Sequence, residues 1–132
     1  MMIIDNKLFD VLSEEARKLS RLRMNYDMRN SSEDKSQRML NAIEPGTELP
    51  IHRHRNSSET CIVLRGVAEE LFYDDNGNIT ERTIMEPTTA CCGVNIPIGL
   101  WHKIVSLEPG TVIFEAKDGS YEPLSPEDIL TL

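Results

Sequence analysis

Residues 46–66 read GTELPIHRHRNSSETCIVLRG, and this segment carries most of the information on architecture and chemistry. His52 and His54 are separated by one residue, so on an extended backbone both imidazoles point to the same face. Two neutral imidazole nitrogens on one face suit a divalent metal. Glu59 follows at the start of an apolar run and adds a carboxylate oxygen.

Short apolar runs separated by turn residues continue on both sides of this segment. Asp74-Asp75-Asn76-Gly77-Asn78 is a strong hairpin signal, and Glu108-Pro109-Gly110 marks another turn. Short strands at such regular spacing are typical of a β-sandwich or barrel. We expect strands over residues 37–43, 60–64, 68–73, 79–85, 94–98, 103–107 and 111–116.

The segments at the two ends of the chain have sequence patterns that do not predict strands. The apolar spacing over residues 6–22 predicts a helix with Asp5 or Asn6 as its N-cap. Residues 23–36 are polar, and we expect a loop around 29–33. Pro126 after Ser125 predicts a very short helix. The expected organisation is an N-terminal helix and loop over 1–35 that pack on a barrel over 36–132.

Composition limits the classes of function. A chain of 132 residues suits one domain. Its formal net charge of −8 argues against binding to nucleic acid or to anionic lipid. No segment approaches the roughly 18 apolar residues of a membrane span. The three cysteines, Cys61, Cys91 and Cys92, form no disulfide framework, so we expect a reducing cytoplasm.

The third and last histidine of the chain, His102, completes a candidate metal site. It follows a turn at Pro97 and Gly99, about 40 residues after Glu59. Three nitrogens and one oxygen suit Fe, Mn, Zn, Ni or Co better than Ca or Mg. Four protein ligands leave open positions on an octahedral metal, which is typical of catalytic sites. A purely structural metal, or no metal, remains the alternative.

The spacing of these residues resembles the two signature motifs of the cupin superfamily. Gly46, His52, His54, Glu59 and Gly66 match the first motif in full. The second motif is looser: GVNIPIGLWHKIVS, residues 93–106, has a gap two residues shorter than the family form, and Ser replaces its final Asn. The ligand histidine and its turn are kept, so the resemblance implies one metal on His52, His54, Glu59 and His102.

A narrower resemblance connects the chain with the WbuC family of cupin-fold metalloproteins. It rests on QRMLNA at residues 37–42, on PGT at 45–47, and on the segments 52–54, 97 and 114–123. This resemblance implies a double-stranded β-helix (jelly-roll) barrel that forms a homodimer. WbuC proteins are associated with bacterial surface-polysaccharide gene clusters, but the family name supplies no reaction.

Two charged residues on predicted strands are candidates for catalysis. Glu115 stands among apolar neighbours and, if it points inward, could act as a general base near the metal. If Arg38 also points inward, its guanidinium could bind a carboxylate or phosphate. The alternative for each is an outward residue at the surface. Cys61 is two residues from Glu59, so on an extended strand both side chains point to the same face. A cysteine in such a position more commonly serves as a small apolar residue of the core.

The resulting hypothesis is a metal-dependent enzyme that acts on a small polar molecule, such as a sugar or sugar nucleotide. Isomerase, lyase and oxygenase chemistry all stay open, because fold alone does not give function. The main alternative is a non-catalytic, metal-dependent module that binds a carbohydrate or acid. A metal-free, epimerase-like cupin ranks last, because that branch normally lacks the paired histidines.

Overall fold

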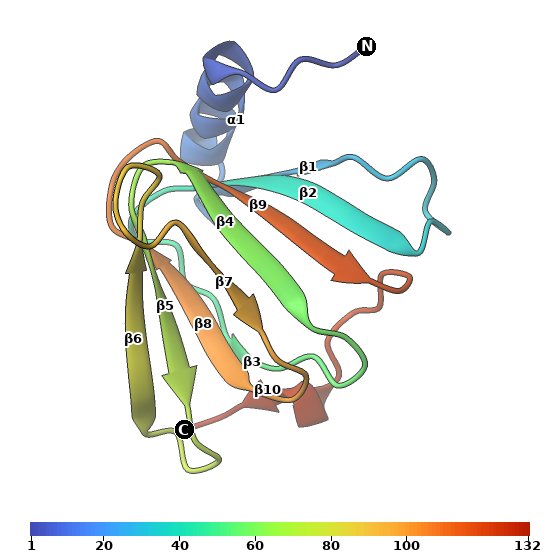
Figure 1. Ribbon diagram of the computed structural model, residues 1–132, viewed down its shortest axis with the longest axis vertical. Helices are drawn as coiled ribbons and strands as arrows, with labels where there is room; N and C mark the ends of the chain where they lie inside the picture. The colour runs from blue at the N-terminus through green and yellow to red at the C-terminus, as the bar shows by residue number, and fades with distance from the viewer.

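A computed structural model describes residues 1–132 and shows two facing five-stranded antiparallel sheets, with one helix packed outside (Figure 1). This confirms the predicted mainly-β jelly-roll barrel with an N-terminal helix. Three strands, over residues 23–27, 51–52 and 129–130, are additions to the predicted set. In chain order the elements are α1 (Asn6–Lys18), β1 (Arg23–Asp27), β2 (Ser36–Ile43), β3 (Ile51–His52), β4 (Glu59–Arg65), β5 (Ala68–Tyr73), β6 (Ile79–Met85), β7 (Gly93–Ile96), β8 (Trp101–Ser106), β9 (Thr111–Asp118), the 3₁₀ turn η1 (Pro126–Asp128) and β10 (Ile129–Leu130).

The pairing of the strands decides which side chains face the interior. The first sheet has the order β1-β2-β9-β4-β7, and the second has the order β10-β3-β8-β5-β6. Glu115 on β9 lies opposite Met39 on β2 and opposite Cys61 on β4. Because side chains alternate along a strand, the odd-numbered residues of β2, of β9 and of β4 up to its bulge after Val63 share one face. That face is the interior of the barrel.

Helix α1 begins where the sequence predicts and ends earlier than predicted. The Asp5 side chain accepts a hydrogen bond from the Leu8 amide at 3.0 Å, which caps the first turn. The helix ends at Lys18, whereas the apolar spacing predicts residue 22. The chain turns there because it must run back along the barrel as β1, and Leu22 adopts a positive φ of 57° in this turn.

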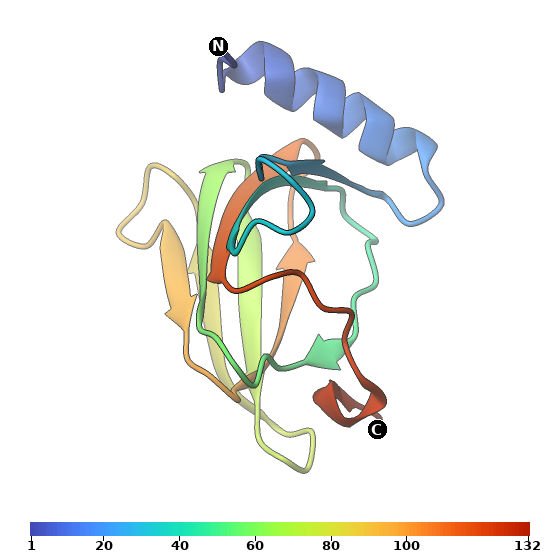
Figure 2. The same ribbon diagram turned by 90° about the vertical axis from the view of Figure 1, so that its right-hand side faces the viewer.

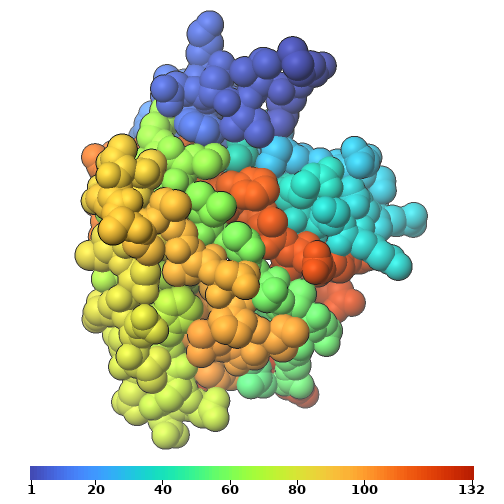
Figure 3. All heavy atoms as spheres, in the orientation of Figure 1, coloured from blue at the N-terminus to red at the C-terminus, as the bar shows by residue number.

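The helix covers the outer face of the first sheet. Phe9, Leu12 and Ala16 are buried there, and Figure 3 shows α1 in dark blue at one end of the molecule. Their partners are Leu40, Ala42 and Val112, together with partly buried neighbours. Arg17 reinforces the contact through an ion pair with the buried Glu44 at 2.9 Å. No helix of the structure is long and apolar enough to cross a membrane.

Part of the polar segment 23–36 is a strand. Residues 23–27 form β1, which pairs along its whole length with β2 at the edge of the first sheet. The N-terminal segment 1–35 therefore contributes a wall of the barrel as well as the helix. The sequence of β1 gives no clear strand signal because the residues that face the cavity, Arg23 and Asn25, are polar. Met24 and Tyr26 pack on the opposite face against the cluster that contains α1.

The interior is divided into a packed end and a hollow end. Ile43, Val63, Met85 and Ile113 belong to the packed core between the sheets. Gly66 ends β4 there with a φ of 85°, and a Cβ at this position would lie 2.3 Å from the Thr111 hydroxyl. The tight turn that joins the two sheets therefore requires glycine. The hollow end contains the predicted metal ligands.

Candidate metal centre

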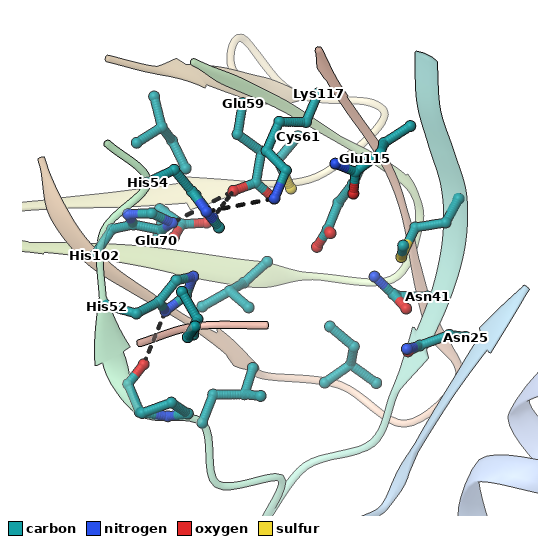
Figure 4. A pocket seen from close by; sticks show the side chains of 18 of the residues that line it. Asn25, Asn41, His52, His54, Glu59, Cys61, Glu70, His102, Glu115 and Lys117 are labelled. Atoms are coloured by element: carbon teal, nitrogen blue, oxygen red, sulfur yellow. Dashed lines mark hydrogen bonds and ion pairs between the residues drawn. The ribbon is translucent and has the colours of Figure 1, made fainter. Parts of the chain in front are cut away.

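Three segments bring the four predicted ligands together at the hollow end of the barrel (Figure 4). His52 lies on β3, and His54 follows it in the loop. Glu59 begins β4, and His102 lies on β8 directly opposite His52 in the register. One candidate ligand atom from each side chain lies within 4.8 Å of all the others. The ligands therefore come from both sheets, which the strand pairing holds in place.

Backbone carbonyls orient two of the histidine rings. His52 donates through Nδ1 to the Pro50 carbonyl at 3.0 Å, and His102 donates through Nδ1 to the Leu100 carbonyl at 2.9 Å. Because a carbonyl oxygen only accepts, both Nδ1 atoms carry the proton and both Nε2 atoms present a lone pair to the centre. Histidines that bind metals usually have their second nitrogen fixed in this way.

The fourth ligand, Glu59, is buried against these nitrogens. Its Oε2 lies 3.0 Å from His54 Nε2 and 3.5 Å from His102 Nε2, yet has no hydrogen-bond partner. Burial by itself would raise the pKa of Glu59, but His102 and His54 outweigh it and hold this pKa well below its usual range. This carboxylate oxygen and the three histidine side chains converge within 4.8 Å of one another, as the ligands of a metal ion do. The donor set therefore fits a divalent transition metal.

The charges of the cluster also affect the histidines. Burial and the neighbouring His102 lower the pKa of His52 to about 4, so this ring is neutral at physiological pH. Burial opposes the charged form of His102, but Glu59 outweighs it and raises the pKa of His102. The Lys117 Nζ lies 3.4 Å from His54 Nδ1, at the side of the cluster that faces the cavity.

A cavity of about 290 Å³ opens in front of the cluster, between the two sheets. All four candidate ligands line it, and its wall is mixed, with apolar side chains such as Ile96 and Ile104 and several charged ones. The segment after β9 crosses its mouth on the way to β10 (Figure 2) and contributes Tyr121, Glu122 and Leu124 to the lining.

Glu115, one of the two predicted catalytic residues, points into this cavity. It lies opposite Cys61 in the strand register, between the histidine cluster and Asn41 (Figure 4). Burial, followed by the charge of Glu59, raises the pKa of Glu115 well above its usual value. Cys61 lines the same wall and is also part of the core, and burial raises the pKa of its thiol.

Arg38, the other predicted catalytic residue, does not reach the cavity. Arg38 is adjacent to Met39 on β2, so its side chain points away from the interior and lies on the outer face of the first sheet. Its guanidinium donates to the Met28 carbonyl at 2.9 Å and pairs with Asp34 at 3.5 Å. The structure therefore places Arg38 in a surface network, which was the alternative expectation for this residue.

Several polar residues of the cavity, among them Glu70, Arg23 and Asn41, have no assigned role in the prediction from sequence. Glu70 on β5 is 2% exposed, and burial raises its pKa to about 8. Arg23 and Asn41 line the opposite wall, on β1 and β2. The sequence does contain a signal that Glu70 points inward, because on the predicted strand its side chain lies on the same face as Ala68 and Phe72. Arg23 gives no such signal, because β1 itself is not evident from the sequence.

Comparison with known proteins gives relatives of the same architecture. The structure of KdgF from Halomonas sp. superposes with a TM-score of 0.60 at 15% identity, over 75% of this chain and 82% of that one. An oxalate oxidase solved with the substrate analogue glycolate gives a TM-score of 0.63 at 11% identity, over 80% and 55% of the two chains. At these identities the likeness establishes the fold.

Among curated sequences, auxin-binding protein 1 from Arabidopsis thaliana is 34% identical over 65 residues. The match spans 49% of this chain and about a third of the length of that relative (32%). The chain therefore has the fold of these cupin structures, and its facing sheets hold three histidines and a glutamate between them. The chain belongs to the family described as Domain of unknown function (DUF6016), whose model matches residues 4–85.

Proposed function

We propose that this protein binds one divalent transition metal through His52, His54, Glu59 and His102 and acts as an enzyme on a small polar molecule. The observation that carries the proposal is the buried Glu59 Oε2, which faces the histidine nitrogens without a hydrogen-bond partner. Its convergence with the ligand atoms of His52, His54 and His102 supports a cation bound between them. Fe, Mn, Zn, Ni or Co are the metals that this donor set suits.

The residues around the centre suit proton transfer to a bound molecule. A metal held there supplies Lewis-acid chemistry, or redox chemistry if it is iron. Glu115 projects into the cavity beside the centre, so its carboxyl oxygens can accept a proton from a bound molecule and return it. The apolar side chains of Ile96 and Ile104 form part of the wall of the same cavity.

The dimensions of the cavity restrict the substrate. About 290 Å³ lies at the lower end of the range for small-molecule sites. This volume suits a monosaccharide or a small acid better than a whole sugar nucleotide. The resemblance to WbuC proteins supports a role in surface-polysaccharide metabolism as the finer assignment.

The test is metal analysis of protein purified without a chelating tag or added metal. We expect about one equivalent of a transition metal in the wild type and a loss of most of it in His52→Ala and Glu59→Gln. The matched control is Glu69→Gln, because Glu69 lies on the outer face of β5 in an ion pair with Arg82. A wild type that takes up no metal even after reconstitution would refute the proposal.

Catalysis is tested separately by incubating the metal-loaded protein with small sugars and acids and following them by NMR. A new product that forms with the wild type and not with His52→Ala supports an enzyme. A compound that binds at the centre and stays unchanged over long incubation supports the alternative, a metal-dependent binding module.

A further inference from the structure

The cavity has a second polar end, on the wall formed by β1 and β2. Arg23 and Asn41 line it, and Asn25 lies opposite Asn41 in the strand register. Figure 4 shows Asn25 and Asn41 on the far side of the cavity from the histidines, with Glu115 between. None of these three residues belongs to the candidate metal centre.

Two buried polar atoms at this end have no hydrogen-bond partner. They are Nε of Arg23 and Oδ1 of Asn41, and the Asn41 residue is only 7% exposed. An unpaired polar atom that is buried costs free energy of folding, so such atoms are uncommon in native proteins. With Glu59 Oε2 at the metal centre, they are the complete set of buried, unpartnered side-chain atoms in the structure. All three lie in residues that line the same cavity.

The charge of Arg23 is also unpaired. Apart from the exposed Arg21, all other arginines take part in ion pairs, whereas Arg23 does not; they are Arg17, Arg29, Arg38, Arg53, Arg55, Arg65 and Arg82. A guanidinium held at the wall of a cavity, with a free N–H donor, matches the geometry of a carboxylate.

The orientation of Asn41 specifies a different group. Its amide nitrogen faces the Glu115 carboxyl, so its oxygen is left for a donor in the cavity (Figure 4). A hydroxyl group can supply that donor, whereas a carboxylate cannot. The partner that Arg23 Nε lacks is therefore an anionic acceptor, and the partner that Asn41 Oδ1 lacks is a hydroxyl donor.

We propose that Arg23, Asn25 and Asn41 form a subsite for the carboxylate and an adjacent hydroxyl of a small hydroxy acid. The inference rests on the proposed function in one respect, namely that the rest of the acid extends past Glu115 to the metal centre. The cavity continues from one end to the other, so a single small molecule can contact both.

Calorimetric binding measurements on the metal-loaded protein test the subsite. The probes are gluconate, sorbitol, which has the hydroxyls without the carboxylate, and hexanoate, which has the carboxylate without hydroxyls. We expect gluconate to bind at least about tenfold more tightly than either of the others, because only gluconate satisfies both groups. Arg23→Met and Asn41→Leu should each weaken gluconate binding by about tenfold or more.

Arg21→Met is the matched control, because Arg21 is exposed two residues away. It should leave the affinity for gluconate unchanged. The second readout is thermal stability without ligand: Arg23→Met should melt at the same temperature as the wild type or higher, because it removes an unsatisfied buried donor. A residue with a merely structural role would lower the melting temperature instead.

The variants separate this inference from the proposed function. Gluconate binding that depends on Arg23 but not on His52 would support the subsite and count against the metal-dependent function. Binding that depends on His52 but is unchanged in Arg23→Met would overturn the subsite alone. Absence of gluconate binding to the metal-loaded wild type would also overturn the subsite, whatever its metal content.

Discussion

Glu115 is the residue whose chemistry depends most on its surroundings. It shares the interior face with Met39 and Cys61 through the register of three strands, and it stands between the histidine cluster and Asn41. Any molecule that contacts both ends of the cavity passes its carboxyl group. A carboxyl in that position can transfer a proton without being a ligand of the metal.

We therefore expect Glu115→Gln to keep the metal content of the wild type and to lower turnover by about 10²- to 10⁴-fold once a substrate is known. The amide preserves the shape of the side chain but cannot accept and return a proton. Metal analysis and rate measurements on the same preparation check this. Glu69→Gln, on the outer face, serves as the control. Unchanged turnover in Glu115→Gln would remove Glu115 from the mechanism.

At the scale of single elements, α1 is the part that is joined to the barrel by side chains alone. Its buried face is narrow, and Leu12 in the middle is 3% exposed while the adjacent Val11 is 56% exposed. The outer face of the first sheet would present Leu40, Ala42 and Val112 to water if the helix came away. The packing of α1 therefore stabilises the sheet as well as the helix.

Leu12→Ala should lower the free energy of unfolding by about 2–5 kcal/mol, because it leaves a cavity between α1 and the first sheet. Val11→Ala is the matched control on the exposed face and should change the same quantity by less than about 0.5 kcal/mol. Denaturation in urea, followed by circular dichroism, measures both. Equal effects of the two substitutions would show that the helix does not pack as described.

At the scale of the whole molecule, the end of the chain closes the second sheet beside the metal centre. β10 pairs with β3, so Ile129 lies opposite His52. Asp128 fixes this segment, because its carboxylate accepts hydrogen bonds from Arg53 and Arg55. Association of two chains into a dimer stays a prediction from the family resemblance.

The Asp128 contacts predict a pH dependence of stability. Arg55, followed by Arg53 and Ser125, lowers the pKa of Asp128 below its ordinary value of 3.8. Because the folded-state pKa is depressed, the stabilisation is present above about pH 4 and is lost as the pH falls through the lowered pKa. The wild type should therefore be more stable than Asp128→Asn at about pH 7, and the difference should shrink below about pH 4.

Unfolding measured in denaturant at several pH values checks this difference. Asp118→Asn is the control, since Asp118 is an exposed carboxylate outside the ion pairs of the structure. It should follow the wild type over the whole range. A difference between the wild type and Asp128→Asn that stays constant to low pH would show that the carboxylate charge is not what fixes the segment.

Features that depend on local patterns are predictable from the amino-acid sequence. Turn residues and alternating apolar positions predict most strands of the barrel, because turns and strand periodicity are set by neighbours along the chain. The spacing of His52 and His54 is equally local, and so it indicates a shared face. For this reason the amino-acid sequence alone predicts the four candidate metal ligands together with the cupin fold.

Which face of each strand points inward depends instead on contacts between distant segments. Glu115 and Arg38 are similar in sequence, each a charged residue in a strand, but the register of β2 with β9 turns one inward and the other outward. A shift by one residue would exchange them, and nothing local to either strand fixes that choice. The edge strand β1, and with it the Arg23 and Asn41 end of the cavity, likewise exists because distant segments pair.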